Sequence, residues 1–137
     1  MSAQNNKALM QSIYAALERG DGEPFGAAMA EDFTWIITGE NAWSGTYRGR
    51  DAVRRDLLKP LYAQFAGEYR NRATRFIADG DLVVVECQGE VTTVRGEAYN
   101  NQYCLVFRIE GGKLKEMREY MDSDLCVRRL TPPPARV

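Results

Sequence analysis

The stretch YNNQYCLVFRIEGGKLKEMREYMD, residues 99–122, decides the fold. Two runs rich in branched and aromatic residues flank Gly111-Gly112, which suits the tight turn of a β-hairpin because its central residues need positive φ. A two-residue turn places five opposed pairs on one face of the sheet: Ile109 with Leu114, Phe107 with Glu116, Leu105 with Arg118, Tyr103 with Tyr120, and Asn101 with Asp122. This face is apolar near the turn and polar at its far end, which favours a pocket wall over a closed core.

The length of 137 residues predicts a single domain with one hydrophobic core. We expect this domain to occupy residues 1–130. Residues 131–137 include three consecutive prolines at 132–134 and are expected to form an extended tail, either loose or laid against a neighbour.

Charge and composition narrow the partners. The chain has 18 basic and 19 acidic residues and a net charge of −1, so it lacks the positive field that attracts nucleic acid or an anionic membrane. No apolar segment is long enough to span a bilayer, and the N-terminus does not resemble a signal peptide, which predicts a soluble, cytoplasmic protein. The expected partner is a small apolar molecule or another protein.

The residues that the chain lacks limit its chemistry. It has no histidine, which excludes Ser-His-Asp and Cys-His nucleophiles and imidazole metal ligands. Cys87, Cys104 and Cys126 have no C-x-x-C spacing, so neither a zinc site nor a disulfide scaffold is expected. No cofactor motif is present, and we expect neither a cofactor nor a metal. Acid–base catalysis would use carboxylates, tyrosines, lysines or water.

Three helices are predicted in the first half of the chain. Apolar residues fall at helical spacing from Gln4 to Arg19, and a shorter helix begins at Glu23-Pro24. A third helical stripe runs from Arg50 to Phe65. Pro60 lies inside this stripe and predicts a kink or break, because proline lacks an N–H donor and clashes with the preceding turn.

Strands are predicted between the second and third helices and after the third. A short strand at Asp32–Thr38 precedes the loop 39–49, whose rings Trp43 and Tyr47 would either cover a cavity or plug the end of the core. Strands at 69–77 and 82–94 then lead to the hairpin. This order predicts an α+β fold, in which three N-terminal helices gather on one face of a curved antiparallel sheet.

The strand 82–94 can face the pocket in two ways. With a two-residue turn at Arg95-Gly96, Glu90 joins the polar end of the pocket face, and Cys87 lies opposite Cys104 on the other face. A bulge or a longer loop would instead turn the alternate residues of this strand to the pocket: Cys87, Gly89 and Val91.

The opposite face of the hairpin mixes apolar and polar side chains: Val106, Met117, Cys104 and Met121 with Arg108, Lys115, Glu119 and Gln102. This face is too apolar for a solvated sheet surface, and the helices cover the other side. We therefore expect a second copy of the chain to cover it, forming a homodimer packed sheet to sheet.

Asp122 is the candidate catalytic acid or base, because it lies at the polar end of the predicted pocket face. Lost hydration would make its carboxylate more basic, and Tyr120 or Asn101 could stabilise an oxyanion. The alternative is structural: Asp122 caps the strand end or pairs with Arg118. The remaining candidates are expected to bind substrate: Trp35, Tyr47, Glu90, Tyr103, Leu105, Phe107 and Arg118.

Three motifs resemble the SnoaL-like, ketosteroid-isomerase-related branch of the nuclear transport factor two-like superfamily: SGTYRGRD (44–51), YNNQY (99–103) and GKLKEMREYMD (112–122). The likeness covers about residues 5–126. It implies a conical α+β barrel with a deep pocket and a dimer through the sheet. It also implies that Asp122 matches the last-strand aspartate of the polyketide cyclases, whose histidine has no counterpart here, and that Tyr14 could match the early-helix tyrosine of the isomerases.

These observations lead to three hypotheses about function. The first is a cofactor-free enzyme that transfers protons on an apolar carbonyl compound, by isomerisation, aldol-type cyclisation or hydration. The second is a non-catalytic ligand-binding or assembly domain with the same cone. The third is water addition like that of the related epoxide hydrolases, for which four residues supply the types but not the spacing: Asn101, Tyr103, Arg118 and Asp122.

Overall fold

The computed structural model describes residues 2–135, so Met1 and positions 136–137 of the predicted tail lie outside the described residues. The strands are β1 (Met29–Ile37), β2 (Gly45–Arg48), β3 (Phe65–Asp79), β4 (Leu82–Thr93), β5 (Gln102–Glu110) and β6 (Lys113–Met121). They form one sheet in the order β2-β1-β6-β5-β4-β3, antiparallel except for the parallel pair β1–β6.

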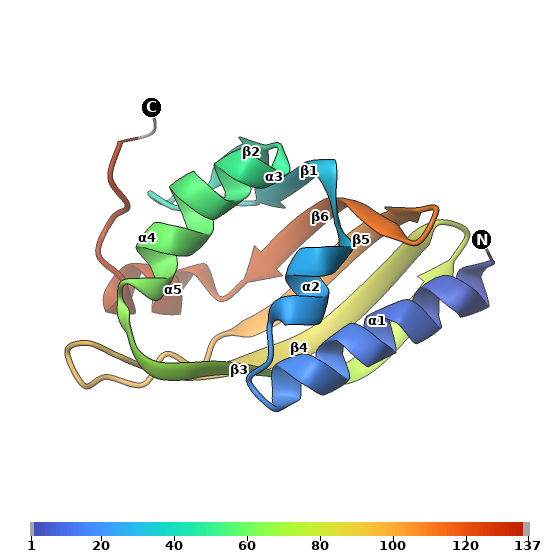
Figure 1. Ribbon diagram of the computed structural model, residues 1–137. Coiled ribbons are helices and arrows are strands. Elements are labelled where there is room, and N and C mark those ends of the chain that lie inside the picture. Colours follow the sequence, from blue (N-terminus) through green and yellow to red (C-terminus); the bar gives the residue numbers. More distant parts are fainter. Residues whose placement is uncertain (1, 136–137) are drawn as a thin grey trace.

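The helices are α1 (Ala3–Glu18), α2 (Glu23–Ala28), α3 (Arg50–Ala52), the π-helix η1 (Val53–Leu58), α4 (Lys59–Tyr62) and α5 (Ser123–Arg129). They gather on the concave side of the curved sheet, with α1 along β3 and β4 (Figure 1). The α+β prediction is confirmed. Within the described residues, none of these helices is both long and apolar enough to cross a membrane.

The helix α1 begins and ends as its sequence indicates. Ser2 is its N-cap and accepts a hydrogen bond from the Asn5 backbone N–H at 3.1 Å. Gly20, just beyond the C-terminus, has a φ of 83°, which favours glycine. The apolar stripe between these ends, which includes Met10 and Tyr14, is buried against the sheet.

The third predicted helix is continuous but irregular. The wide π-helical turn η1 immediately precedes α4, in which Pro60 occupies the first turn. Because proline cannot complete the regular hydrogen-bond ladder of an α-helix, the irregularity expected at this position takes the form of a π-helical turn.

The central hairpin forms at Gly111-Gly112, but its predicted register is wrong beyond the first pairs. Ile109 pairs with Leu114 as expected, whereas Arg108 pairs with Glu116, so Lys115 is an extra residue in β6. This β-bulge shifts the pairing by one residue and reverses which side chains of β6 face the helices.

The bulge exchanges the two faces of β6. Met117, Glu119 and Met121 point to the concave side, while Arg118 and Tyr120 point outward. The prediction for β5 is correct, because the extra residue lies in β6 and the alternation of side chains along β5 is undisturbed. The inward residues of β5 are Tyr103, Leu105, Phe107 and Ile109.

The strand β4 adopts the second of its two predicted arrangements. Cys87 pairs with Tyr103 rather than Cys104, and the buried residues of this part of the strand are Cys87, Gly89 and Val91. Glu90 is exposed and pairs with Arg70 of β3. The placement of Glu90 on the pocket face is therefore wrong, because the connection to β5 is longer than a two-residue turn.

The chain ends in a short helix that the sequence pattern did not predict. Asp122 is the N-cap of α5, and its Oδ1 accepts a hydrogen bond from the Leu125 backbone N–H at 3.1 Å. Beyond α5, Leu130 is buried and Thr131 exchanges two hydrogen bonds with the Gln64 side chain, both at 2.9 Å. The start of the tail is thus attached to its own domain.

The convex face of the sheet, turned away from the helices, was predicted to carry Met117, Glu119 and Met121. These three side chains do not lie on it. It retains the half-buried Cys104 and Val106 and gains Tyr120, which is 46% exposed. The homodimer through this face and the cytoplasmic location stay predictions.

The cap on α5 predicts the effect of replacing Asp122. Asp122→Ala removes the acceptor for an N-terminal N–H of the helix, and we expect the free energy of unfolding to fall by about 1 kcal/mol. Asp122→Asn preserves the cap and should leave stability close to wild type. Chemical denaturation measures both, with Ser123→Ala, an exposed position of the same turn, as the control. Equal stability of Asp122→Ala and Ser123→Ala would show that the cap contributes nothing.

Candidate functional site

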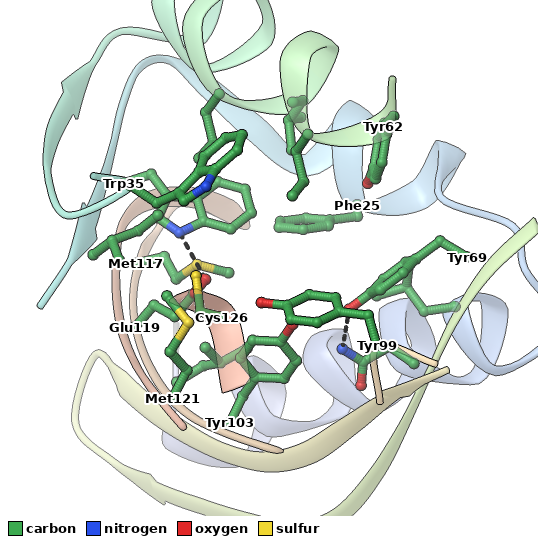
Figure 2. A pocket seen from close by; sticks show the side chains of 18 of the residues that line it. Phe25, Trp35, Tyr62, Tyr69, Tyr99, Tyr103, Met117, Glu119, Met121 and Cys126 are labelled. Atoms are coloured by element: carbon green, nitrogen blue, oxygen red, sulfur yellow. Dashed lines mark hydrogen bonds between the residues drawn. The ribbon is translucent and has the colours of Figure 1, made fainter. Parts of the chain in front are cut away.

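A cavity lies between the helices and the concave face of the sheet (Figure 2). Its volume is about 70 Å³, room for several water molecules at roughly 10–15 Å³ each. Of its 21 lining residues, nine are aromatic and most others are aliphatic. The lining comes from both layers of the fold, including α1, α2, η1, α4, α5 and the strands β1, β3, β5 and β6.

Glu119 of β6 is the acidic residue of the cavity wall. It is 7% exposed, and its Oε1 accepts a hydrogen bond from Trp35 Nε1–H of β1 at 3.0 Å (Figure 2). Burial raises the pKa of Glu119 to about 7, and the hydrogen bond from Trp35, which favours the ionised form, offsets only part of this. Glu119 can therefore gain or lose a proton near neutral pH.

Three phenols from the sheet side lie across the cavity from Trp35: Tyr69, Tyr99 and Tyr103 (Figure 2). Burial raises the pKa of each, and the charge of Glu119 raises it further. The phenols therefore stay protonated at neutral pH. The Tyr69 and Tyr99 hydroxyls accept N–H groups from Asn71 and Asn101, both at 3.0 Å, so each can still donate its own hydrogen.

The position of Tyr69 depends on a glycine beneath it. A Cβ atom at Gly89 of β4 would lie 2.9 Å from the Tyr69 hydroxyl oxygen and 3.1 Å from its ring. Glycine therefore allows the phenol to lie directly on the backbone of the sheet.

Two buried polar atoms in residues that line the cavity lack hydrogen-bond partners within the described part of the chain. They are Trp43 Nε1, a donor, and Asn71 Oδ1, an acceptor. The loop around Trp43 is well anchored, because the Trp43 backbone N–H donates to Asn41 Oδ1 at 2.8 Å and Tyr47 Oη donates to the Trp43 carbonyl at 2.9 Å. Unpaired buried polar atoms are rare in folded proteins and are typical of sites that receive a ligand or water.

Four of the predicted binding residues do line the cavity: Tyr14, Trp35, Tyr103 and Leu105. Tyr47 and Phe107 are buried but lie outside the lining. Tyr47 instead supports the loop that carries Trp43, and Phe107 packs against the Tyr14 ring at a centroid distance of 6.4 Å. The Trp43 loop therefore covers the cavity, the first of its two predicted roles.

Four other predicted residues are exposed and lie outside the cavity: Glu90, Arg118, Tyr120 and Asp122. The β-bulge at Lys115 turns Arg118 and Tyr120 outward, and Asp122 caps α5 at the surface. The predicted position of Asp122 at the pocket mouth is therefore wrong. Its role is structural, but as the N-cap of a helix rather than the strand cap or the Arg118 partner that we expected. The four residues suggested for epoxide hydrolysis are not brought together.

Asn101 is fully buried but does not line the cavity. Its Nδ2 donates to the Asp122 carbonyl at 3.2 Å, and its Oδ1 accepts from the backbone N–H groups of Gln102 at 2.8 Å and Asp122 at 3.2 Å. The side chain thus joins the start of β5 to the end of β6. Its Nδ2 reaches two residues of the cavity lining, the Tyr99 hydroxyl at 3.0 Å and Met121 Sδ at 3.6 Å.

Sequence reasoning missed the central carboxylate and several aromatic walls. Glu119 was assigned to the convex face, and Phe25, Tyr62, Phe65, Tyr69 and Tyr99 were not proposed as site residues. One signal was present: the predicted register buried Glu116 opposite Phe107 in the apolar part of the sheet. A bulge that places Met117 there instead removes this conflict, and Met117 does pair with Phe107.

The assembled groups suit proton transfer without a metal ligand set. Glu119 can accept or donate a proton, and the neutral phenols can stabilise negative charge that develops on an oxygen atom. Within residues 2–135, no group of three or more histidine, cysteine, aspartate and glutamate side chains is arranged to hold a metal ion.

The curved sheet, the covering helices and the enclosed apolar cavity define a protein of the nuclear transport factor two-like class. The model of the SnoaL-like domain family matches residues 10–117. The chain therefore belongs to the SnoaL-like family, as its motifs indicated.

Solved structures with the same fold cover nearly the whole chain. An NTF2-like protein of unknown function from Burkholderia pseudomallei K96243 is 26% identical with a TM-score of 0.76, over 93% of this chain and 98% of that chain. A putative SnoaL-like polyketide cyclase from Jannaschia sp. CCS1 is 15% identical with a TM-score of 0.75, over 96% and 95%. TerC, co-crystallised with polyporic acid, is 24% identical with a TM-score of 0.75, over 90% and 96%. No curated protein sequence matches significantly.

Burial of Glu119 predicts a specific dependence of stability on pH. Because its folded pKa lies near 7 and that of an unfolded glutamate near 4.5, the folded protein holds a proton that the unfolded chain releases between these values. We expect wild type to lose about 3 kcal/mol of stability relative to Glu119→Gln as the pH rises from about 4.5 to 7.

Urea denaturation of the two proteins across this pH range measures the difference. Glu116→Gln, which removes a carboxylate from the outward face of the same strand, is the matched control and should track wild type. Parallel pH profiles for wild type and Glu119→Gln would contradict a buried carboxyl with a raised pKa.

Proposed function

We propose that this protein is a cofactor-free enzyme that moves a proton on a small carbonyl compound, with Glu119 as the catalytic base and acid. One observation carries the proposal: a single carboxyl group, with a pKa near 7, lies inside a mostly apolar cavity. A base is most effective when its pKa lies near the working pH, because it is then both ionised and strongly basic.

The reaction follows from the groups that face the cavity. The Glu119 carboxylate takes a proton from the carbon next to the carbonyl, and the electrons of that C–H bond move onto the carbonyl oxygen to form an enolate. A phenol such as Tyr103 donates a hydrogen bond to this oxygen. In isomerisation, protonated Glu119 then returns the proton to a different carbon. In cyclisation, the enolate carbon attacks a second carbonyl, and the alkoxide that forms takes the proton from Glu119, which restores the carboxylate.

Trp35 has a positioning role in this mechanism. Its N–H holds one carboxylate oxygen of Glu119, which fixes the orientation of the group and leaves Oε2 as the oxygen for a substrate proton. The rings of Phe25 and Phe33 pack against the Trp35 indole in tilted and edge-on geometry, with centroid distances of 5.9 Å and 6.2 Å. The base therefore does not depend on a mobile loop for its geometry.

The relatives support a ligand-binding cavity and leave the reaction open. TerC was crystallised with polyporic acid, and a further relative is a putative polyketide cyclase. The second candidate is therefore a protein that binds a small molecule without converting it. The unpaired Trp43 Nε1 and Asn71 Oδ1 support the binding protein and the enzyme to the same degree, because they can orient a ligand whether or not a reaction follows.

The proposed base can be tested without knowing the natural substrate. In D₂O, an enzyme of this type exchanges hydrogens next to a carbonyl, which NMR detects directly. With a panel of small aryl ketones and β-diketones, we expect wild type to accelerate exchange for at least one compound. The rate should rise with pH through about 7, as Glu119 ionises.

Glu119→Gln should lower this exchange rate about 100-fold or more, which is the usual contribution of a general base. Asp122→Asn is the matched control, because it removes an exposed carboxylate near the end of the same strand and should retain the wild-type rate. The assignment of Glu119 as the base would be wrong if Glu119→Gln kept the wild-type exchange rate, or if only Asp122→Asn lost it. Ligand binding without any exchange would favour the second candidate.

A further inference from the structure

We propose that the cavity selects ligands that carry a positively charged organic ammonium group, which lies between Glu119 and the aromatic walls. The inference names the ligand class for the same cavity as the proposed function and rests on that cavity being the ligand site. It is carried by three features of the described lining residues: one buried carboxyl group, no lysine or arginine, and nine aromatic rings.

No basic side chain lines the cavity among the described residues. The lining contains one carboxylic acid, Glu119, and neither lysine nor arginine. The lysines and arginines that form ion pairs do so at the protein surface, as in Arg75 with Glu86 and Lys115 with Asp32. A carboxylate or phosphate on a ligand would therefore enter an apolar space without a cation to pair with, which is costly.

The aromatic walls favour positive charge. Nine rings line the cavity, among them both tryptophans of the chain and five tyrosines. The face of an aromatic ring carries partial negative charge, so an ammonium group within about 6 Å of it is attracted, more strongly when the site excludes water. Figure 2 shows labelled rings on opposite sides of the open space, Trp35 and Phe25 on one and Tyr103 and Tyr69 on the other.

Among residues 2–135, no lysine or arginine is paired with Glu119. Trp35 gives it one neutral hydrogen bond at 3.0 Å, and no lysine or arginine contributes to its pKa. A buried ionised carboxylate without a counter-ion is unfavourable, and a bound cation would remove this cost. The two unpaired polar atoms of the lining residues have opposite partial charges, Asn71 Oδ1 negative and Trp43 Nε1–H positive, so the carboxylate is the group that favours a cation.

The other titratable groups around Glu119 do not change this balance at neutral pH. The charge of Glu119 acts on six of them, from α1, β3, β4, β5, α5 and the segment before β5: Tyr14, Tyr69, Cys87, Tyr103, Cys126 and Tyr99. Burial raises the pKa of every one, so all six remain neutral where Glu119 titrates. Any change in affinity between pH 5.5 and 8.5 is therefore assigned to Glu119.

A pair of matched probes tests the proposal. Choline carries a quaternary ammonium that does not titrate, and 3,3-dimethyl-1-butanol has the same shape with carbon in place of nitrogen. Both tryptophans line the cavity, so their fluorescence reports binding there, and calorimetry confirms the affinity. At pH 8.5 we expect choline to bind at least tenfold more tightly than the neutral alcohol, a typical gain for a desolvated cation near aromatic rings.

The charge preference should depend on Glu119. The affinity for choline should fall roughly tenfold or more from pH 8.5 to 5.5, as the carboxylate takes up its proton, while that for the alcohol stays constant. Glu119→Gln should abolish the preference at pH 8.5, and Glu116→Gln on the outward face should retain it.

The outcomes separate the two proposals. Equal or tighter binding of the neutral alcohol overturns the ammonium inference and leaves the proton-transfer proposal intact. The same conclusion follows if neither probe binds while ketone exchange persists. A preference for choline with no dependence on pH or on Glu119 also overturns it. A Glu119-dependent preference for choline without any exchange activity supports the inference and counts against the enzyme.

Discussion

One extra residue in a β-strand determines which side chains of β6 line the cavity. The bulge at Lys115 shifts the pairing of β6 against β5 and turns Glu119 inward, while Tyr120 and Arg118 face solvent. Without it, strict alternation would bring Arg118 and Tyr120 into the cavity. The bulge is held from outside the hairpin, because Lys115 Nζ forms an ion pair with Asp32 of β1 at 2.7 Å.

The inward carboxyl is costly to the fold and useful to the site for the same reason. Apolar neighbours deprive Glu119 of hydration, which disfavours its ionised form and brings its pKa to about 7. Trp35 donates the one hydrogen bond that keeps the group oriented. The fold therefore holds a carboxyl group whose pKa lies near neutrality, and shifted pKa values of this kind are common at functional sites.

The sequence was sufficient for the architecture and insufficient for the site. Periodicity, Gly111-Gly112 and the SnoaL-like motifs correctly predicted the α+β class, the hairpin and the inward residues of β5. The position of a β-bulge depends on tertiary packing, so counting from the turn assigned β6 to the wrong face. The short helix α5 was missed for a similar reason, since Asp122 was considered as a catalytic group and as a strand cap, but not as a helix N-cap.

The floor of the cavity sets a limit on its depth. Tyr69 lies against Gly89, a residue with no side chain, so the phenol is already as close to the sheet as the backbone allows. Any replacement at position 89 would lift the ring and make the cavity shallower, and no replacement could make it deeper. Variation at this single position can therefore narrow the range of ligand sizes in related proteins, whereas acceptance of larger ligands requires smaller side chains elsewhere in the lining.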